Sequence, residues 1–593
     1  MRSLPDLPQD KPVLLSDGHS YYKNLPEMLH VRMLLSCLCD ADYTATASHE
    51  NESVMNEAID QTADANAILR SLLDYQLDIS KHSNANPELN KIRSHVFQSC
   101  LRAAEQAPGM FTLTAPTGTG KTLALLGFAA KHAAVHRKRR IIVVLPFLSI
   151  ISQNAKIYRD ICGDILEAHS MASYGDNDRT KLLAERWNAP VIVTTSVKFF
   201  EAFFKSKPSD LRFLHSIADS VVVFDEAQSI PQNLVGTTIE TMRILCETFR
   251  CTVLFSTAPQ PAFNIRKDID FPANEIIPDA ADLYAQTRRV SVDWQIETRT
   301  SLEQIAIEMA DKESVCCVLN RKDHAHKLYD FLKTKCSEET CFHISTDMCK
   351  AHRDFTITAI TVRLKKHLPC RLISTSCIEA GVDLDFSYMY RALAPLDSIV
   401  QCAGRCNRNG NSKGKMTVFV PDEEKLYPAD YYKNSEIIIR TLLSKNEIDI
   451  YNPEHIREYY TKLFTHENYD HDKLKLTEAI SNHDFAAAEK EYRFIPQKGV
   501  NVLVPYSGRI ELFYELAEEA RKKGISKDWM RLAAPITVTS YYEDKLKDIA
   551  EPCYIFYKGT KIYVPGWYIL LSAEFYTDAG LHFDDESSLD CLI

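Results

Sequence analysis

The middle of the chain alternates short apolar runs with longer segments in which apolar positions recur at helical spacing. Runs at 111–115, 141–145, 191–195, 220–225 and 251–257 are apolar at nearly every position instead of at alternate ones. Strands buried on both faces show this pattern, and helical segments between them allow the strands to run in parallel. We therefore predict an α/β domain in which helices cover both faces of a parallel sheet.

A second series of runs follows at 315–319, 341–345, 371–374, 388–393 and 416–420, which predicts a second α/β domain. The join lies near 262–300, where Pro272 and Pro278 interrupt a polar stretch. We expect residues 1–85 to be a helical segment with a linker, 86–285 the first α/β domain and 286–425 the second. Residues 426–593 are expected to hold linker helices and an accessory domain that ends in aromatic strands at 554–557 and 561–571.

Composition bounds the class of protein. A hydrophobic content of 45% and a charged content of 25% are ordinary for a globular chain. No run of about 20 apolar residues predicts a membrane span. The 17 cysteines form no CxxC pair, which favours reduced thiols and a cytoplasmic location. The net charge of -11 argues against a wholly basic surface, but backbone amides and hydroxyls can still bind nucleic-acid phosphates.

A glycine-rich loop at 117–122 reads Thr-Gly-Thr-Gly-Lys-Thr and lies between a predicted strand and an alanine-rich helix. Such a loop points backbone N–H groups at phosphates, and the helix N-terminus adds a favourable dipole. We expect Lys121 to reach the β- and γ-phosphates of a nucleotide and Thr122 to offer its hydroxyl to Mg²⁺.

An acidic pair follows the apolar strand at 220–225, where ligand sites form in α/β folds. We expect Asp225 to hold Mg²⁺ through water and Glu226 to orient and deprotonate an attacking water. Downstream, the spacing of Arg405 and Arg408 places both on one face of a predicted helix. Arginines from a second domain can stabilise a transferring phosphoryl group. The loop at 374–386 is expected to turn Asp383 toward the nucleotide.

The ordered motifs together resemble those of the superfamily 2 helicases over residues 90–425. They are TGTGKT at 117–122, VLPFLSIISQN at 144–154, VTTS at 193–196, DEAQ at 225–228, STA at 256–258, STSCIEAGVDLDF at 374–386 and QCAGRCNR at 401–408. The resemblance implies two tandem RecA-like domains with ATP and Mg²⁺ between them.

A narrower resemblance, carried by IEAGVDLDF at 378–386 and by STAPQP after DEAQ, is to the type I CRISPR-associated helicase-nucleases. It implies a single-stranded DNA substrate and recruitment by the Cascade complex. It also implies a nucleotide site that includes Arg93, Gln98, Thr117, Gly118, Thr119, Gly120, Gly381, Asp383 and Gln401, with Arg93 and Gln98 as rival readers of the adenine. The implied DNA track is lined by Pro146, Phe147, Ser149, Thr195, Ser196, Asn320, Arg321 and Thr375.

Two departures from the family's pattern qualify these expectations. The family normally opens with a metal-dependent HD nuclease domain, whereas the segment before the helicase motifs resembles only the last helix of that domain, with Asp40 and Asp42. We expect no HD-site transition metal and no nuclease activity from this chain alone. Two explanations stay open: the nuclease is encoded separately and docks on this helix, or the chain is truncated. Pro259, in place of a hydroxyl residue, suggests weakened coupling of hydrolysis to DNA movement.

The leading hypothesis is an ATP-dependent DNA translocase or helicase of type I CRISPR interference. Two alternatives remain open. One is a decayed or regulatory binding protein with little ATP turnover. The other is a superfamily 2 helicase that acts on RNA.

Overall fold

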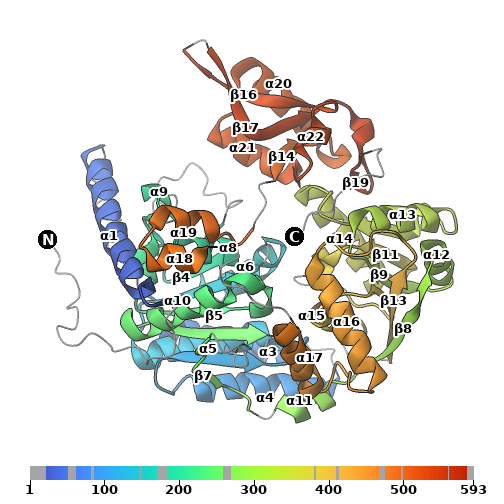
Figure 1. Cartoon of the computed structure of the whole chain (residues 1–593), viewed down its shortest axis with the longest axis horizontal. Coiled ribbons are helices and arrows are strands. Elements are labelled where there is room, and N and C mark those ends of the chain that lie inside the picture. Colours follow the sequence, from blue (N-terminus) through green and yellow to red (C-terminus); the bar gives the residue numbers. More distant parts are fainter. Residues whose placement is uncertain are drawn as a thin grey trace.

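A computed structural model describes most of the chain. Described are residues 22–50, 62–81, 86–146, 148–169, 184–257, 263, 269–278, 280–379, 382–408, 410, 413–466, 475–495, 499–558 and 560–583, without the side chains of 47–50, 148–150, 152, 153, 465 and 466. Figure 1 shows two α/β units side by side and a smaller unit above them.

The first unit is built on a seven-stranded sheet with the order β3-β4-β2-β5-β6-β1-β7. Every pairing in it is parallel. Its strands are β1 (Met110–Thr114), β2 (Arg140–Leu145), β3 (Leu166–Ala168), β4 (Val191–Thr195), β5 (Ser220–Phe224), β6 (Thr252–Thr257) and β7 (Ala273–Glu275). The central strands are buried along their whole length, which is why their sequence runs are continuously apolar.

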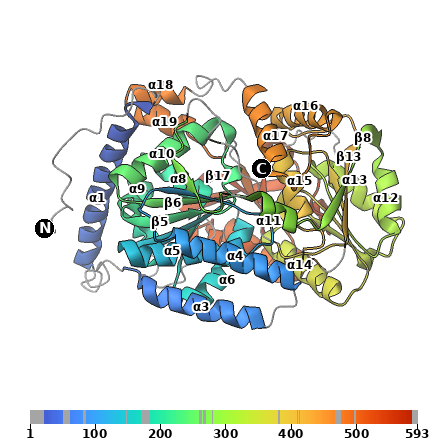
Figure 2. The same ribbon diagram turned by 90° about the horizontal axis from the view of Figure 1, so that it is seen from below.

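Helices cover both faces of this sheet. One layer holds α3 (Ala65–Lys81), α4 (Pro87–Ala103), α5 (Lys121–His136) and α6 (Leu148–Cys162), seen side by side in Figure 2. The opposite layer holds α8 (Ser196–Ala202), α10 (Val235–Thr248) and one face of α1 (Leu25–Glu50). The helix α3, which belongs to the expected N-terminal segment 1–85, therefore packs in the core of the first unit.

The second unit has a six-stranded sheet with the order β10-β11-β9-β12-β13-β8, again paired in parallel. Its strands are β8 (Val290–Thr300), β9 (Ser314–Val318), β10 (Cys341–Ile344), β11 (Cys370–Ser374), β12 (Tyr388–Ala392) and β13 (Gly414–Pro421). The flanking helices include α11 (Ala280–Gln286), α12 (Leu302–Ala310), α13 (Lys322–Lys333), α14 (Lys350–Lys365) and α15 (Leu396–Ala403).

The region after residue 425 is divided among all three units. Helices α16 (Asp430–Ser444) and α17 (Pro453–His466) pack in the core of the second α/β unit. Helices α18 (Leu476–Ser481) and α19 (Phe485–Glu491) pack on the first unit, close to α1 (Figure 1).

Residues 499–583 form the smaller unit. Its four-stranded sheet has the order β15-β14-β17-β16, with β14 (Val500–Leu503), β15 (Thr537–Ser540), β16 (Ala550–Tyr557) and β17 (Thr560–Leu570). The helices α20 (Ile510–Lys523) and α21 (Lys527–Ala533) pack against it.

The strands predicted from continuous apolar runs are all present to within one or two residues of the expected ends. In the smaller unit the prediction omitted β14 and β15, although β14 lies inside its sheet. In the two α/β units it omitted β3, β7 and β8. Each of these three lies at a sheet edge, and β7 and β8 are largely half-buried or exposed, so they carry no continuous apolar run.

Candidate functional site

The loop between β1 and α5 carries the predicted phosphate-binding motif. Gly118 has a φ of 84° and Gly120 a φ of 79°, a left-handed conformation that side chains disfavour. Thr119 caps the turn by donating its hydroxyl to the Pro116 carbonyl at 2.8 Å. Lys121 is buried, and its Nζ donates to the Ala115 carbonyl at 3.1 Å, so the ammonium lies back over the loop. These left-handed glycines and internal hydrogen bonds curl the loop.

The acidic pair lies at the carboxyl end of β5, next to this loop. Asp225 is buried, and burial, followed by repulsion from Glu226, raises its pKa to about 6 although Lys121 acts in the opposite direction. Glu226 has a φ of 55°, and its carboxylate accepts from Gln228 Nε2 at 2.5 Å. Because of the left-handed turn at Glu226, the carboxylates of Asp225 and Glu226 point in different directions. The Glu226 carboxylate lines the space between the two α/β units.

Arg405 interacts electrostatically with Glu226 from the second unit, and neither Arg405 nor Arg408 stands on a helix. The expectation that both lie on one helical face is wrong, because α15 ends at Ala403 and Gly404 is its C-cap. Beyond it, Cys406 forms a bridge with Phe386. A left-handed Asn407, with a φ of 47°, turns the chain again past the helix end, so Arg405 and Arg408 stand in non-helical segments.

Carbonyl and carboxylate groups of the 374–386 loop hold both arginines. Arg405 donates from Nε and Nη2 to the Glu379 carbonyl at 3.2 and 2.8 Å. Burial, and then repulsion from Arg408, lowers the pKa of Arg405 to about 10, while Glu226 acts to raise it across the interface. Arg408 Nε lies 3.0 Å from an Asp383 oxygen. Asp383 therefore faces Arg408, at the margin of the interdomain space.

The two rival adenine readers lie on α4 in different settings. Arg93 is half-buried, and its Nε donates to the Gly118 carbonyl at 3.1 Å. Gln98 is exposed. Of the two, the described structure brings Arg93 to the phosphate-binding loop.

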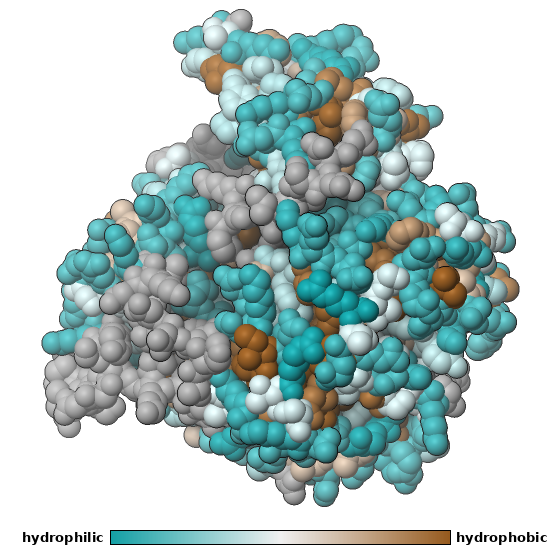
Figure 3. Space-filling model, turned by 45° about the vertical axis from the view of Figure 1, so that its right-hand side comes forward, coloured by the Kyte–Doolittle hydropathy of each residue, from teal (hydrophilic) through white to brown (hydrophobic). Residues whose placement is uncertain are grey.

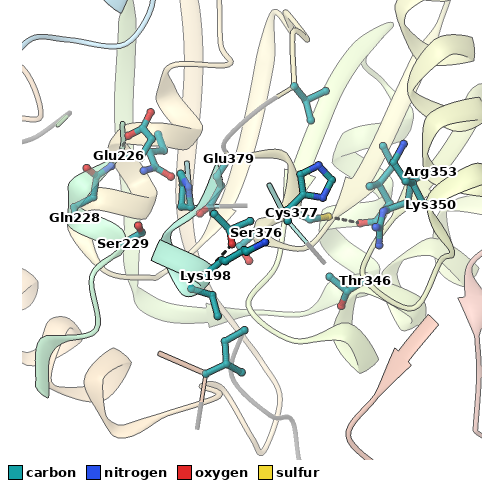
Figure 4. Close-up of a pocket in the computed structure, with 18 of the residues that line it drawn as sticks. Lys198, Glu226, Gln228, Ser229, Thr346, Lys350, Arg353, Ser376, Cys377 and Glu379 are labelled. Atoms are coloured by element: carbon teal, nitrogen blue, oxygen red, sulfur yellow. Dashed lines mark hydrogen bonds between the residues drawn. The ribbon is translucent and has the colours of Figure 1, made fainter. Parts of the chain in front are cut away.

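A cavity of about 1270 Å³ lies between the two α/β units. The first unit contributes Glu226, Gln228, Ser229 and Lys198, and the second contributes Ser376, Cys377, Glu379, Thr346, Lys350 and Arg353 (Figure 4). Gln401 and Asp383 also line it. Burial lowers the pKa of Lys198, although Asp210 and Glu185 act against that shift. The cavity therefore carries basic groups from both units, but acidic side chains such as Glu201, Asp210 and Asp354 line it as well, and Asp354 pairs with Lys350.

The implied track residues fall into different positions. Pro146 and Thr195 line the cavity, and Ser196 lies buried beside Thr195 at the start of α8. Asn320 donates to the Leu393 carbonyl at 2.8 Å, and Arg321 pairs with Asp323 at 2.8 Å. Thr375 is buried and donates to Cys377 Sγ at 3.6 Å. Phe147, Gly381, Pro259 and the side chain of Ser149 lie outside the described residues.

Sequence analysis did not single out several residues at the site. Lys198 stands on α8, and Lys350 and Arg353 stand on α14, where a basic residue signals nothing by itself. Arg289 precedes the edge strand β8 and donates to the Thr117 carbonyl at 3.0 Å. Only the packing of the two units reveals that these residues face the site.

The helix α1 carries the aspartates compared with the end of a nuclease domain. Asp40 is buried and receives hydrogen bonds from Arg186 and Arg212 at 2.9 Å. Asp42 is exposed. In this structure Asp40 anchors α1 to the first α/β unit. Over the residues with described placement, no three His, Cys, Asp or Glu side chains are gathered in a way suited to a metal ion.

Within the described ranges, every helix is too short or too polar to cross a bilayer. The face in Figure 3 is mainly hydrophilic, with apolar residues in small separate groups.

Two family models match this chain. The model of DEAD/DEAH box helicases matches residues 90–265, and the model of the C-terminal part of the CRISPR-associated nuclease/helicase Cas3 matches residues 311–411. The two matched segments coincide with the two α/β units that enclose the site.

Curated relatives of this chain are also named CRISPR-associated nuclease/helicase Cas3. The chain is 24% identical over 456 residues to a CRISPR-associated nuclease/helicase Cas3 of Haloferax volcanii, covering 56% of this chain and 48% of the relative. It is 22% identical over 529 residues to one of Methanothermobacter thermautotrophicus, covering 83% of this chain and 60% of the relative. The chain thus spans about half of the length of these relatives.

Solved structures support the fold. The crystal structure of T. fusca Cas3 with AMPPNP has a TM-score of 0.61 at 15% identity, covering 89% of this chain and 71% of that one. A chain of a CRISPR RNA-guided surveillance complex before nicking has a TM-score of 0.53 at 16% identity, covering 79% of this chain and 65% of that one. The chain is thus similar in sequence to DEAD/DEAH box helicases and to CRISPR-associated nuclease/helicases, and it shares the tandem α/β fold of the solved Cas3 structures.

Proposed function

We propose that this chain is an ATP-driven translocase or helicase that acts on single-stranded DNA in type I CRISPR interference. The observation that carries the proposal is the meeting of the two α/β units at one site. Thr117 of the phosphate-binding loop packs on Gly404, and Arg405 interacts electrostatically with Glu226. A site divided between two units changes when the units close or open, which is how hydrolysis can be converted into movement.

In this proposal the loop 117–122 binds the phosphates of ATP, with Lys121 at the β- and γ-phosphates. Arg93, Gly381, Asp383 and Gln401 complete the nucleotide site, with Gln98 as the rival of Arg93. A magnesium ion fits the residues present, because Thr122 and Asp225 offer only oxygen ligands, and Asp225 is a buried carboxylate beside the Lys121 ammonium. Such an ion supplies charge neutralisation to the phosphates.

Glu226, Arg405 and Arg408 are proposed to carry out the hydrolysis step. Glu226 accepts a proton from a water that attacks the γ-phosphorus, while the bond to the bridging oxygen breaks and leaves ADP and phosphate. Arg405 and Arg408 stabilise the negative charge that develops on the transferring group. Both are held by the 374–386 loop, so their position depends on the closure of the second unit onto the first.

The DNA strand is proposed to follow the cavity between the units. Pro146 and Thr195 line it, and Lys198, Lys350 and Arg353 place cations along it. The proposed track also includes Phe147, Ser149, Ser196, Asn320, Arg321 and Thr375. Backbone phosphates need no base-specific contact, so this track suits a motor that moves along any sequence.

Recruitment by a Cascade-type RNA-guided complex is proposed from the relatives' names and from the fold shared with a chain of a surveillance complex. A cytoplasmic site of action is in keeping with the free state of all 16 described cysteines.

A separately encoded nuclease is a further proposed partner, because the relatives are named nuclease/helicases. Its docking surface is the outward face of α1, where Val31, Leu34 and Leu38 are 51%, 53% and 66% exposed. Replacing Leu34 and Leu38 by lysine should abolish binding of such a nuclease in pull-down with purified proteins. Unchanged binding would place the partner elsewhere.

The decisive experiment measures ATP hydrolysis with and without single-stranded DNA. We expect DNA to stimulate hydrolysis severalfold and Lys121→Ala to remove both basal and stimulated activity, because the loop loses its cation at the phosphates. Lys131→Ala, a half-buried lysine further along the same helix that pairs with Glu105, is the matched control and should behave like the wild type. An unstimulated protein in which Lys121→Ala changes nothing would refute the proposal.

The same assay separates the alternatives. Stimulation by RNA and not by DNA at equal salt would indicate an RNA helicase. The salt concentration must be the same because nucleic-acid affinity depends strongly on it. Nucleotide binding without turnover would indicate a regulatory protein. The pair Asp225 and Glu226 next to the curled loop 117–122 favours turnover.

A further inference from the structure

Two arginines, one from each α/β unit, bind successive carbonyls of the phosphate-binding loop. Arg289, from the segment between α11 and β8, donates to the Thr117 carbonyl at 3.0 Å. Arg93, from α4, donates to the Gly118 carbonyl at 3.1 Å. The Arg289 guanidinium also lies against Gly118, where a side chain would come within 3.1 Å of its Nη2. No helicase motif in the sequence contains Arg289.

These contacts set the direction of the loop's donors. The Thr117 carbonyl and the Gly118 N–H belong to one planar trans peptide, so they point in opposite directions. The same holds for the Gly118 carbonyl and the Thr119 N–H. When the two arginines hold the carbonyls, they turn the two N–H groups to the other side of the loop. Successive N–H groups on one side form a concave site for an anion.

The backbone of Arg289 is tied to the segment that carries Arg408. Its carbonyl accepts from Asn407 Nδ2 at 3.2 Å and from the Gly414 N–H at 3.1 Å. The side chain therefore contacts the first unit while the backbone belongs to the second. Any separation of the units would withdraw the guanidinium from Thr117.

The charges around the loop favour an anionic ligand. Burial, followed by Arg408 and Arg289, lowers the pKa of Arg93. Burial also lowers the pKa of Arg289, and Arg408 adds to that effect while Asp385 opposes it. Three guanidinium groups thus repel one another beside the loop, and a triphosphate would relieve that repulsion.

We propose that Arg289 is a positioning residue for the nucleotide: it orients the Thr117–Gly118 peptide from the second unit and so links domain closure to phosphate binding. The role rests on the proposed ATP-driven function of the site. Arg289 does this without contacting the reacting atoms.

The test compares Arg289→Ala with Arg288→Ala. Arg288 is the matched control, because it is the neighbouring arginine, is exposed and pairs with Asp449 away from the loop. Steady-state ATP hydrolysis gives kcat and KM, and titration gives the Kd for AMPPNP. We expect Arg289→Ala to raise KM and Kd roughly tenfold, the effect of losing a hydrogen bond from a charged group. Arg289→Lys should recover part of that loss, and Arg288→Ala should match the wild type.

Thermal unfolding monitors the fold of each variant. If Arg289→Ala unfolds early, Arg289→Gln, which removes the charge and shortens the side chain but keeps a polar end, replaces it in the same comparison. Unchanged KM and Kd in Arg289→Ala, or an equal loss in Arg288→Ala, would overturn the proposal. A wild-type protein that binds AMPPNP but hydrolyses no ATP would refute the proposed function, while the binding titration would still test Arg289.

Discussion

At the residue scale, the interface between the two α/β units depends on a glycine. Gly404 ends α15, and a Cβ there would lie 2.3 Å from Thr117 Oγ1 and 3.0 Å from the Gln401 carbonyl. Real Cβ atoms do not approach so closely, so even one methyl group must push the second unit away from the phosphate-binding loop.

We therefore expect Gly404→Ala to lower kcat for ATP hydrolysis by roughly tenfold, since an overpacked contact typically costs about 1–3 kcal/mol. Nucleotide binding to the first unit alone should change less. Steady-state kinetics at saturating single-stranded DNA measures the effect. The matched control is Gly109→Ala, where a Cβ would meet nothing within 4 Å. Equal kcat values for Gly404→Ala and the wild type would show that closure tolerates the extra methyl.

At the element scale, α1 is fixed to the first unit by one apolar face and one buried ionic cluster. Leu25, Met28 and Leu29 enter the core beneath α10. Asp40 lies between Arg186 and Arg212, with Nη2 of the former and Nε of the latter at 2.8 and 2.9 Å. Removing one member of a buried cluster leaves the other charges without compensation, which costs far more than a surface pair.

Asp40→Asn should accordingly release the second half of α1. Breaking a buried pair costs on the order of 3–5 kcal/mol. Hydrogen–deuterium exchange of 25–46 should become much faster, while exchange in β5 and β6 stays slow. The matched control is Asp42→Asn, an exposed carboxylate on the same helix. Slow exchange of α1 in Asp40→Asn would indicate that apolar packing alone holds the helix.

At the scale of the whole molecule, the C-terminal unit is attached to the second α/β unit at a junction rich in histidine and tyrosine. The Tyr576 hydroxyl accepts from the Cys349 N–H at 3.0 Å and lies 3.1 Å from His352 Nδ1. The His352 ring stacks on Tyr506, and Leu581 N–H donates to the Asp347 carbonyl at 2.7 Å. The C-terminal unit therefore moves with the second unit.

Acid should weaken this junction. Burial lowers the pKa of His352 to about 4, although Asp578 acts to raise it and Arg353 to lower it further. An unfolded histidine titrates near 6.5, so between about pH 6.5 and 4 the detached state binds more protons, and stability falls as the pH falls.

The expected result is faster hydrogen–deuterium exchange of 499–583 at pH 5 than at pH 7, after correction for the intrinsic effect of pH. His352→Gln, which stays neutral, should reduce that difference, whereas His367→Gln, on a loop of the second unit, should leave it unchanged. If the pH dependence is unchanged in His352→Gln, other buried histidines cause it. His343 is one of these, and burial lowers its pKa as well.

The sequence predicted the elements that are buried on both faces, because continuous apolar runs have few other structures available to them. The central strands of both sheets and the helix after the phosphate-binding loop were predicted in this way. The edge strand β8 was not, because its exposed positions are polar. The helical placement of Arg405 and Arg408 was wrong, since a spacing of three residues does not reveal that Gly404 ends the helix.

The sequence alone predicted the chemistry of the proposed ATP site, because the residues of the glycine-rich loop are neighbours in the chain and so are those of the strand-end acidic pair. The tertiary structure alone decided what reaches that site from a distance. Arg289 stands far from the loop in sequence, and only the packing of one unit on the other brings it to Thr117. The use of Asp40 as an anchor was likewise decided by Arg186 and Arg212, which local sequence could not place beside it.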